Sequence, residues 1–180
     1  MLVVGVVGSP NAGGRTRVAV DAVLAGAAAE GADTRVLELA DTEVPDAVAA
    51  MTEADAVVLG SPTYRADISA KLKSLLEGTQ RGMPNESSDP LRGTVCATVL
   101  TGASDHHFLA IEKVRGVLGG FFGTQILSPG LYLKSIDYTE DASALRDESA
   151  QLAKLHGRAL VELATAVRSS KWLRELRPLV

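Results

Sequence analysis

Cysteine, aromatic side chains and long apolar runs are all scarce in this sequence of 180 residues. The single cysteine, Cys96, has no second cysteine to pair with, which excludes the disulfide-rich scaffolds of small secreted domains. The apolar run at the start of the sequence is about seven residues long, too short for a membrane span or for the core of a signal peptide. We therefore expect a cytoplasmic protein with no membrane contact.

Neither basic nor acidic residues are in large excess. The chain carries 18 Lys and Arg against 22 Asp and Glu, a net charge of −4, whereas proteins that bind nucleic acid electrostatically need a basic surface. We expect no nucleic-acid partner. Hydrophobic residues make up 46% and charged residues 22%, an ordinary globular composition that excludes a disordered acidic or basic tail. The length predicts a single domain over residues 1–180.

Short apolar segments alternate with helical patterns along the chain. Strands are predicted at residues 3–7, 34–39, 56–60, 94–100 and 125–133, the last interrupted at Pro129 and Gly130. Several of these segments are continuously apolar, as in strands that are buried on both faces of a parallel sheet. Helices are predicted between them, including 45–54, 108–122 and 142–168. This order predicts an α/β fold of three layers with a five-stranded parallel sheet in the flavodoxin-like order 2-1-3-4-5.

Polar and glycine-rich segments follow three of the predicted strands, at residues 8–16, 61–65 and 101–107. In doubly wound sheets, ligands bind beyond the carboxyl ends of the strands, at the point where the strand order reverses. We therefore expect these three loops to meet at one edge of the sheet and to form the binding site.

The first loop has the composition of a phosphate-binding loop. Glycines allow a tight turn into a helix, whose first N–H groups attract anions. Its candidate ligands are Ser9, Asn11, Arg15 and Thr16, which offer polar side chains and one cation suited to a terminal phosphate. A Walker A loop is disfavoured because Arg15 stands where its lysine would be, and the glycine spacing of a Rossmann fingerprint is absent.

The second and third loops offer different chemistry. The second contains Pro62, Thr63, Tyr64 and Arg65, in which Tyr64 could stack on a planar ring and Arg65 could reach an oxygen or a phosphate. The third contains Thr101, Gly102, Ala103 and Ser104 before a helix, where backbone amides can form an anion-friendly nest.

Four other residues are read as structural. His106 and His107 have the pattern of exposed loop or cap residues, and no neighbouring cysteine or carboxylate pair completes a metal site. Cys96 lies inside an apolar strand and is expected to be inert core. Trp172, near the end of the chain, is expected to serve packing or an oligomer contact.

Taken in order, the three loops resemble the NADPH-dependent FMN reductase family, in a pattern similar to that of the flavin reductases of alkanesulfonate monooxygenase systems. Gly8-Ser9-Pro10 with Arg15-Thr16, Ser61-Pro62-Thr63-Tyr64 through Ser69 to Leu72-Lys73, and Thr101-Gly102 with His107-Phe108-Leu109-Ala110 carry this resemblance. It runs from about Val3 to Leu133 and implies that FMN and NADPH are the cofactors.

The resemblance also implies roles for the site residues. Ser9, Arg15 and Thr16 would hold the FMN phosphate, and residues 62–65 would flank the isoalloxazine ring. The amides of residues 101–104 would contact the pyrimidine side of the ring and stabilise its reduced form. The implied activity is hydride transfer from NADPH to FMN, followed by electron transfer to a second acceptor.

Two alternatives to a flavin reductase remain open. The protein could keep FMN bound and reduce a quinone, azo or nitro compound, or it could be a flavodoxin-like electron carrier without nicotinamide activity. The expected partners are a small-molecule electron acceptor or a partner monooxygenase. We also expect a homodimer, with a tetramer as the alternative, because Phe121, Phe122, Leu131 and Tyr132 could form an apolar patch. The same four residues would serve equally well as core.

Overall fold

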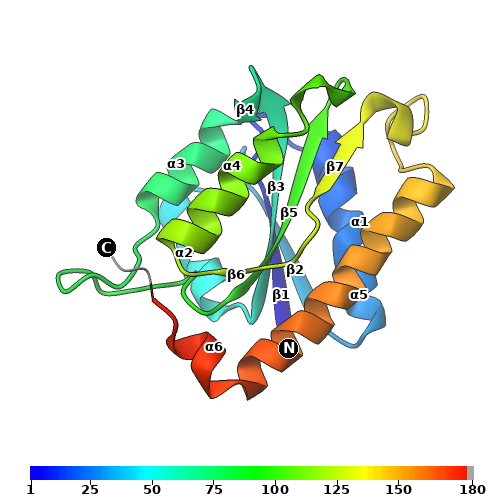
Figure 1. Ribbon diagram of the computed structural model, residues 1–180. Coiled ribbons are helices and arrows are strands. Elements are labelled where there is room, and N and C mark those ends of the chain that lie inside the picture. Colours follow the sequence, from blue (N-terminus) through cyan, green and yellow to red (C-terminus); the bar gives the residue numbers. More distant parts are fainter. Residues whose placement is uncertain (178–180) are drawn as a thin grey trace.

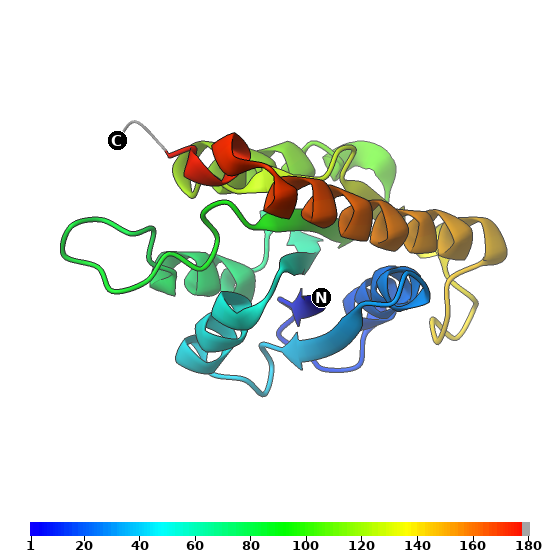
Figure 2. The same cartoon turned by 90° about the horizontal axis from the view of Figure 1, so that it is seen from below.

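A parallel sheet lies between two layers of helices in the computed structural model of the protein, which describes residues 1–177 (Figures 1 and 2). The strands follow one another across the sheet in the order β2-β1-β3-β5-β6. They are β1 (Leu2–Val7), β2 (Asp33–Glu38), β3 (Ala56–Tyr64), β5 (Val95–Gly102) and β6 (Gln125–Ile126). The predicted α/β class and the order of the parallel strands are confirmed.

The predicted number of strands is wrong, because the sheet formed by residues 1–177 has seven and not five. The fifth position is divided between β6 and β7 (Leu131–Lys134), which both pair with β5. Pro129 lies between them and has no N–H group to continue the ladder. The remaining strand, β4 (Asp67–Ile68), forms a short antiparallel hairpin with the end of β3.

The helices divide between the two faces of the sheet. Helices α1 (Arg15–Ala29) and α5 (Asp147–Ser169) cover one face, and α2 (Val44–Glu53), α3 (Ala70–Gly78) and α4 (Ala110–Gly116) cover the other. Alternate residues of β1 point to opposite faces: Val3 and Val7 belong to the core below α1, and Val4 and Val6 belong to the core below α2 and α3. Burial on both faces explains the unbroken apolar run of this strand.

The long helix predicted at residues 108–122 begins later, at Ala110, and is divided in two, because it changes from α-helical to π-helical at Val117. A 3₁₀ turn, η1 (Asp105–His107), precedes α4, and a π-helical turn, η2 (Val117–Phe121), follows it. The helix predicted at 142–168 begins later, at Asp147, after the 3₁₀ turn η3 (Ser135–Asp137), and it is followed by the short helix α6 (Lys171–Glu175). No helix in the described part of the chain combines the length and the apolar character needed to cross a membrane.

The exposure of the side chains differs within the predicted apolar patch and is high at Trp172. Phe122 and Leu131 are 2% and 3% exposed and belong to the core, whereas Phe121 is 45% exposed. The predicted apolar patch is therefore reduced to Phe121 and the half-buried Tyr132. Trp172 is 73% exposed, so it does not pack into this chain.

Cys96 is fully buried in β5, and this burial raises the pKa of its thiol to about 12. We expect no reaction with a thiol reagent at pH 8 in the native protein and rapid reaction once denaturant unfolds the chain. Because the unfolded thiol loses its proton at lower pH than the folded one, this group also makes stability fall as the pH rises from about 9 towards 12. Rapid labelling of the native protein would contradict the assignment of Cys96 as inert core.

Candidate functional site

The three predicted loops lie at the ends of β1, β3 and β5, at the same edge of the sheet (Figure 1). Two strands run further than predicted, because residues 61–64 belong to β3 and residues 101–102 belong to β5. The first and third loops are in direct contact, because the hydroxyl oxygens of Thr16 and Thr101 share a hydrogen bond at 2.9 Å. Both side chains are buried, with 4% and 6% exposure, although they lie 85 residues apart in the sequence. The fold therefore brings the predicted phosphate loop and the loop after β5 together.

Ser69, just before α3, joins the first loop to the second. Its hydroxyl donates a hydrogen bond to the carbonyl oxygen of Gly8 and accepts one from the N–H of Leu72, so it also caps α3. The N–H of Ser69 donates to the hydroxyl of Ser61 at 2.9 Å, and the N–H of Gly8 donates to the carbonyl of Gly60 at 2.7 Å. The ends of β1 and β3 are thus held together where the two loops begin.

Two glycines allow these close approaches. A Cβ atom at Gly8 would lie 2.7 Å from the Cβ of Leu72 and 3.0 Å from the carbonyl oxygen of Gly60. A Cβ atom at Gly102 would lie 1.9 Å from the hydroxyl of Tyr132, which donates a hydrogen bond to the carbonyl of Ser104 at 3.0 Å. Larger residues at either position would push apart the segments that form the edge.

The start of α1 has the features of an anion site. Gly14 stands at the N-cap, no side chain in the described part of the chain caps the helix, and its first turn contains no acidic residue. The first N–H groups and the positive end of the helix dipole are therefore available to a ligand. The hydroxyl of Ser9, whose side chain is buried, accepts a hydrogen bond from the N–H of Asn11 at 3.2 Å and shapes the turn, while Asn11 itself is exposed.

Glu38, at the end of β2, was not predicted as a site residue. One of its carboxylate oxygens accepts a hydrogen bond from the N–H of Gly13 at 2.8 Å. The other accepts one from Arg17 at 2.7 Å, and Arg17 also pairs with Asp21. Gly13 has a φ of +69°, a left-handed conformation that favours glycine. Glu38 thus holds the first loop at the position where the backbone turns through a positive φ.

Arg15 is held by a segment that was also not predicted. Its guanidinium donates to the hydroxyl of Ser135 at 2.8 Å and lies 5.6 Å from the centre of the Tyr138 ring. The Tyr138 hydroxyl donates to the carbonyl of Arg15 at 3.1 Å. Burial raises the pKa of Tyr138, which keeps this phenol protonated and able to donate. The segment after β7 therefore positions the cation at the start of α1.

The tip of the second loop, at Tyr64 and Arg65, is exposed and extends away from the contacts that join the loops. Pro62 and Thr63 are half-buried, and the buried hydroxyl of Thr63 has no hydrogen-bond partner within residues 1–177. Such an atom is a natural contact for a ligand. Tyr64 is 48% exposed, and Arg65 follows it in the turn of the β3–β4 hairpin with a φ of +52°. Lys113 of α4 holds this hairpin through the carbonyl of Ala66, at 3.2 Å.

The third loop is organised by its own side chains. The hydroxyl of Ser104 shares a hydrogen bond with Nδ1 of His106 at 2.9 Å. Lys134 of β7 pairs with Asp105 at 2.8 Å, and this hydrogen-bonded pair raises the pKa of Lys134. Ala103 is exposed beside these groups, as are both histidines. No cluster of three or more His, Cys, Asp or Glu residues among those described could hold a metal ion.

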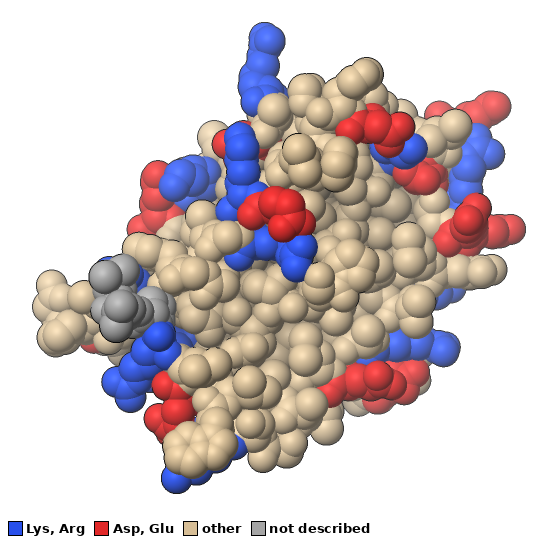
Figure 3. All heavy atoms as spheres, viewed as in Figure 1, with Lys and Arg blue, Asp and Glu red and all other residues tan. Residues whose placement is uncertain are grey.

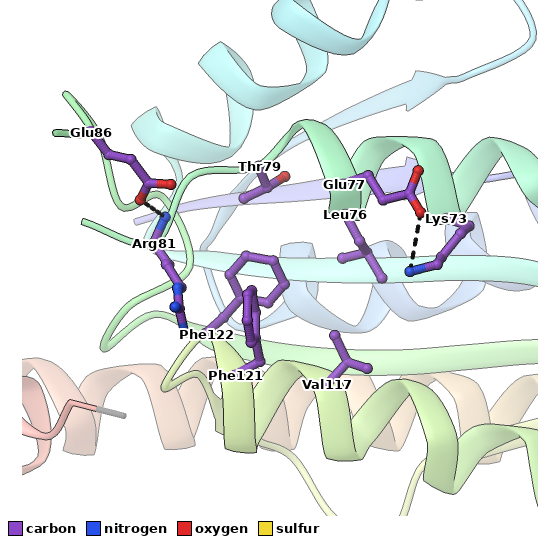
Figure 4. A pocket seen from close by; sticks show the side chains of 9 residues that line it. All are labelled: Lys73, Leu76, Glu77, Thr79, Arg81, Glu86, Val117, Phe121 and Phe122. Atoms are coloured by element: carbon purple, nitrogen blue, oxygen red, sulfur yellow. Dashed lines mark hydrogen bonds and ion pairs between the residues drawn. The ribbon is translucent and has the colours of Figure 1, made fainter. Parts of the chain in front are cut away.

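A hollow of about 400 Å³ lies away from this edge, between α3 and the π-helical turn η2 that follows α4 (Figure 4). The described residues that line it are Lys73, Leu76, Glu77, Thr79, Arg81, Glu86, Val117, Phe121 and Phe122. None of the predicted site residues is among them. The hollow therefore belongs to the outer helical face and not to the three loops.

The chain is similar in sequence to known flavin proteins. The chain matches the family model described as NADPH-dependent FMN reductase over residues 1–138. An iron-sulfur flavoprotein of Methanocaldococcus jannaschii is 34% identical over an alignment 125 residues long, with a coverage of 58% of this chain and 63% of that protein. The chain thus spans less than two thirds of the length of that relative.

Solved structures share the fold. An NADH:FMN oxidoreductase, EMOB, in its apo form has a TM-score of 0.77 at 19% identity, covering 97% of this chain and 94% of that one. RosB, with 8-demethyl-8-formylriboflavin-5'-phosphate bound, has a TM-score of 0.80 at 16% identity, covering 96% and 82%. At these identities the likeness shows the fold, which is flavodoxin-like. Because the matching family model spans all three loops of the site, the chain belongs to the NADPH-dependent FMN reductase family.

Proposed function

We propose that the protein is an FMN-dependent NAD(P)H oxidoreductase. The observation that carries this proposal is the buried hydrogen bond between Thr16 and Thr101, which joins a loop suited to a phosphate to a loop suited to the ring of the same ligand. Membership of the NADPH-dependent FMN reductase family supports it.

The residues of the edge fit FMN. Its phosphate matches the uncapped start of α1, where Arg15 and the hydroxyls of Ser9 and Thr16 supply a cation and donors. The unpartnered hydroxyl of Thr63 lies in the loop assigned to the ring. The narrow gaps at Gly8 and Gly102, which a Cβ would fill, keep these loops close enough to bind one ligand.

When bound, FMN would supply two-electron redox chemistry between NADPH and a second acceptor. The chain contributes binding and electrostatics. Arg15 and the start of α1 hold the charge of the phosphate, and the backbone donors around Ala103 and Ser104 favour negative charge on the ring side. The histidines that follow are not required, because positioning and charge can account for the contribution of the protein.

The test is NADPH oxidation by flavin-stripped protein as FMN is added. We expect saturable oxidation that depends on FMN, followed at 340 nm, and direct FMN binding measured by quenching of flavin fluorescence. FMN binding without NADPH oxidation would replace the reductase with an electron carrier. Absence of FMN binding would overturn the assignment of the three loops. Ping-pong kinetics with retained flavin would favour a bound group that reduces a quinone, azo or nitro compound.

Glu38 offers a matched pair of variants for the phosphate loop. We expect Glu38→Ala to weaken FMN binding about fivefold, because one hydrogen bond that positions Gly13 is worth about 1 kcal/mol. Glu38→Gln keeps an acceptor for Gly13 and should bind FMN within about twofold of the wild type. Fluorescence titration measures both. Equal weakening in the two variants would assign the effect to the charge of Glu38 and not to its geometry.

A further inference from the structure

A second hollow, of about 520 Å³, lies where the end of α5, helix α6 and the segment before β5 meet. We call it the basic pocket. The described residues that line it are Arg92, Arg168, Ser169, Lys171, Arg174, Glu175 and Arg177. Five of these side chains are cationic and one is acidic, in a chain whose net charge is −4. Figure 3 shows basic side chains in this region, at the lower left over α6, with acidic side chains beside them.

The cations of the basic pocket are only partly neutralised. Arg92 pairs with Asp89, and Arg168 pairs with Asp55 at 2.9 Å. Within residues 1–177, Arg174 and Arg177 form no ion pair. Cations that line a hollow concentrate the positive potential inside it, since the low-dielectric walls focus the field. The basic pocket is therefore a place where an anion would be attracted.

The frame of the basic pocket is held in place by packing. The hydroxyl of Ser170 accepts a hydrogen bond from the N–H of Leu173 at 3.3 Å, and Leu173 packs against the core below α1 and α5. On the other wall, a Cβ at Gly93 would lie 3.3 Å from the carbonyl oxygen of Arg174. Helix α6 thus lies directly against the segment that leads into β5, and the pocket exists before any ligand binds.

The basic pocket is remote from the flavin site. Arg92 precedes β5, whereas the third loop of the site lies at its other end, and the eight residues of β5 separate the two ends of the strand by roughly 23 Å. A ligand in the basic pocket would not touch the residues that we assign to FMN. It would occupy a separate site with its own chemistry.

We propose that the basic pocket binds a small oligophosphate, meaning a ligand with two or more linked phosphate groups. Guanidinium groups bind phosphate oxygens in pairs, and several arginines around one hollow match several linked phosphates better than a single one. The volume lies in the range of small-molecule sites. The net charge of −4 disfavours a long nucleic acid, which would extend beyond the pocket over the rest of the surface.

The test uses calorimetric titration of the FMN-loaded protein with inorganic tripolyphosphate, so that bound FMN occupies the phosphate loop. The pocket variant carries Arg174→Gln and Arg177→Gln. The matched control carries Arg35→Gln and Arg158→Gln, which remove two cations that pair with Glu53 and Glu30 elsewhere. We expect the wild type and the control to bind tripolyphosphate and the pocket variant to bind it at least about tenfold more weakly. FMN affinity, NADPH oxidation and melting temperature should be unchanged in both variants.

Other outcomes would overturn the proposal. These are no binding of tripolyphosphate, equal weakening in the control, or orthophosphate binding as tight as that of tripolyphosphate. A single-stranded oligonucleotide that binds more tightly than tripolyphosphate and is lost in the pocket variant would replace the small ligand with a nucleic acid. Titration with ADP and ATP tests whether the linked phosphates belong to a nucleotide. If ADP and ATP bind more tightly than inorganic diphosphate and triphosphate, the ligand is a nucleotide. If they bind equally, the pocket recognises the phosphate chain alone.

Discussion

Arg15→Ala is expected to weaken FMN binding by about tenfold to a hundredfold, because a hydrogen bond to a charged group contributes roughly 1.5–3 kcal/mol. The guanidinium stands at the start of α1 and is held there by Ser135 and Tyr138. A phosphate at this helix end would lose one side-chain cation. Fluorescence titration of flavin-stripped protein measures the change, and the loss should shrink as salt is added.

Two further variants give this prediction its controls. Arg15→Lys keeps the charge but not the paired donors, so its affinity should lie between those of the wild type and Arg15→Ala. Arg158→Ala removes an exposed cation of α5 that pairs with Glu30, and it should leave FMN affinity unchanged. If Arg15→Ala binds FMN as tightly as the wild type, the phosphate is held elsewhere and the role of the first loop is wrong.

Gly157→Ala is expected to cause a large loss of stability. Helices α1 and α5 cross so closely that a Cβ at Gly157 would lie 1.9 Å from the carbonyl oxygen of Val23, and a Cβ at Gly26 would lie 2.0 Å from that of Lys154. Backbone atoms cannot move aside as a flexible side chain can, so the helices must separate. We expect a cost of about 3 kcal/mol and a melting temperature lower by about 6–12 °C.

Gly116→Ala is the matched control, because Gly116 also lies in a helix but a Cβ there would meet no atom within 4 Å. Alanine has the higher helix propensity, so this variant should be as stable as the wild type or more stable by about 0.5–1 kcal/mol. Thermal unfolding followed by circular dichroism compares the two. Similar melting temperatures for both variants would mean that α1 and α5 are not in backbone contact at Gly157.

The strands near the start of the chain and the meeting of the three loops at one edge of the sheet could be predicted, because strand burial and turn composition are local patterns. A continuous apolar run such as the one in β1 indicates burial on both faces, and a glycine-rich segment after it indicates a turn into a helix. The rule that ligands bind beyond the carboxyl ends of parallel strands then placed the three loops at one edge. The interruption at Pro129 was predicted, but its consequence was not: the fifth strand is divided into two separate strands, β6 and β7.

The residues that support the first loop could not be predicted in the same way. Glu38 lies 25 residues from Gly13, and Ser135 and Tyr138 lie 120 and 123 residues from Arg15. No periodicity or spacing links such pairs, because they meet only after α1, β2 and β7 have packed. An acidic residue at the end of a strand and a tyrosine in a loop are both ordinary in a sequence.

The amino-acid pattern of this protein was sufficient for its fold class and its family resemblance, since burial and turn formation depend on neighbouring residues. The strand order then followed from the flavodoxin-like fold that the alternation of strands and helices indicates. Tertiary packing was needed to show that Phe121 is exposed and Phe122 buried, that Thr16 meets Thr101, and that Arg92 and Arg168 line one hollow. Adjacent residues can point to opposite sides of a helix or strand, and distant ones can share a site. Which of them meet depends on how whole elements pack against one another.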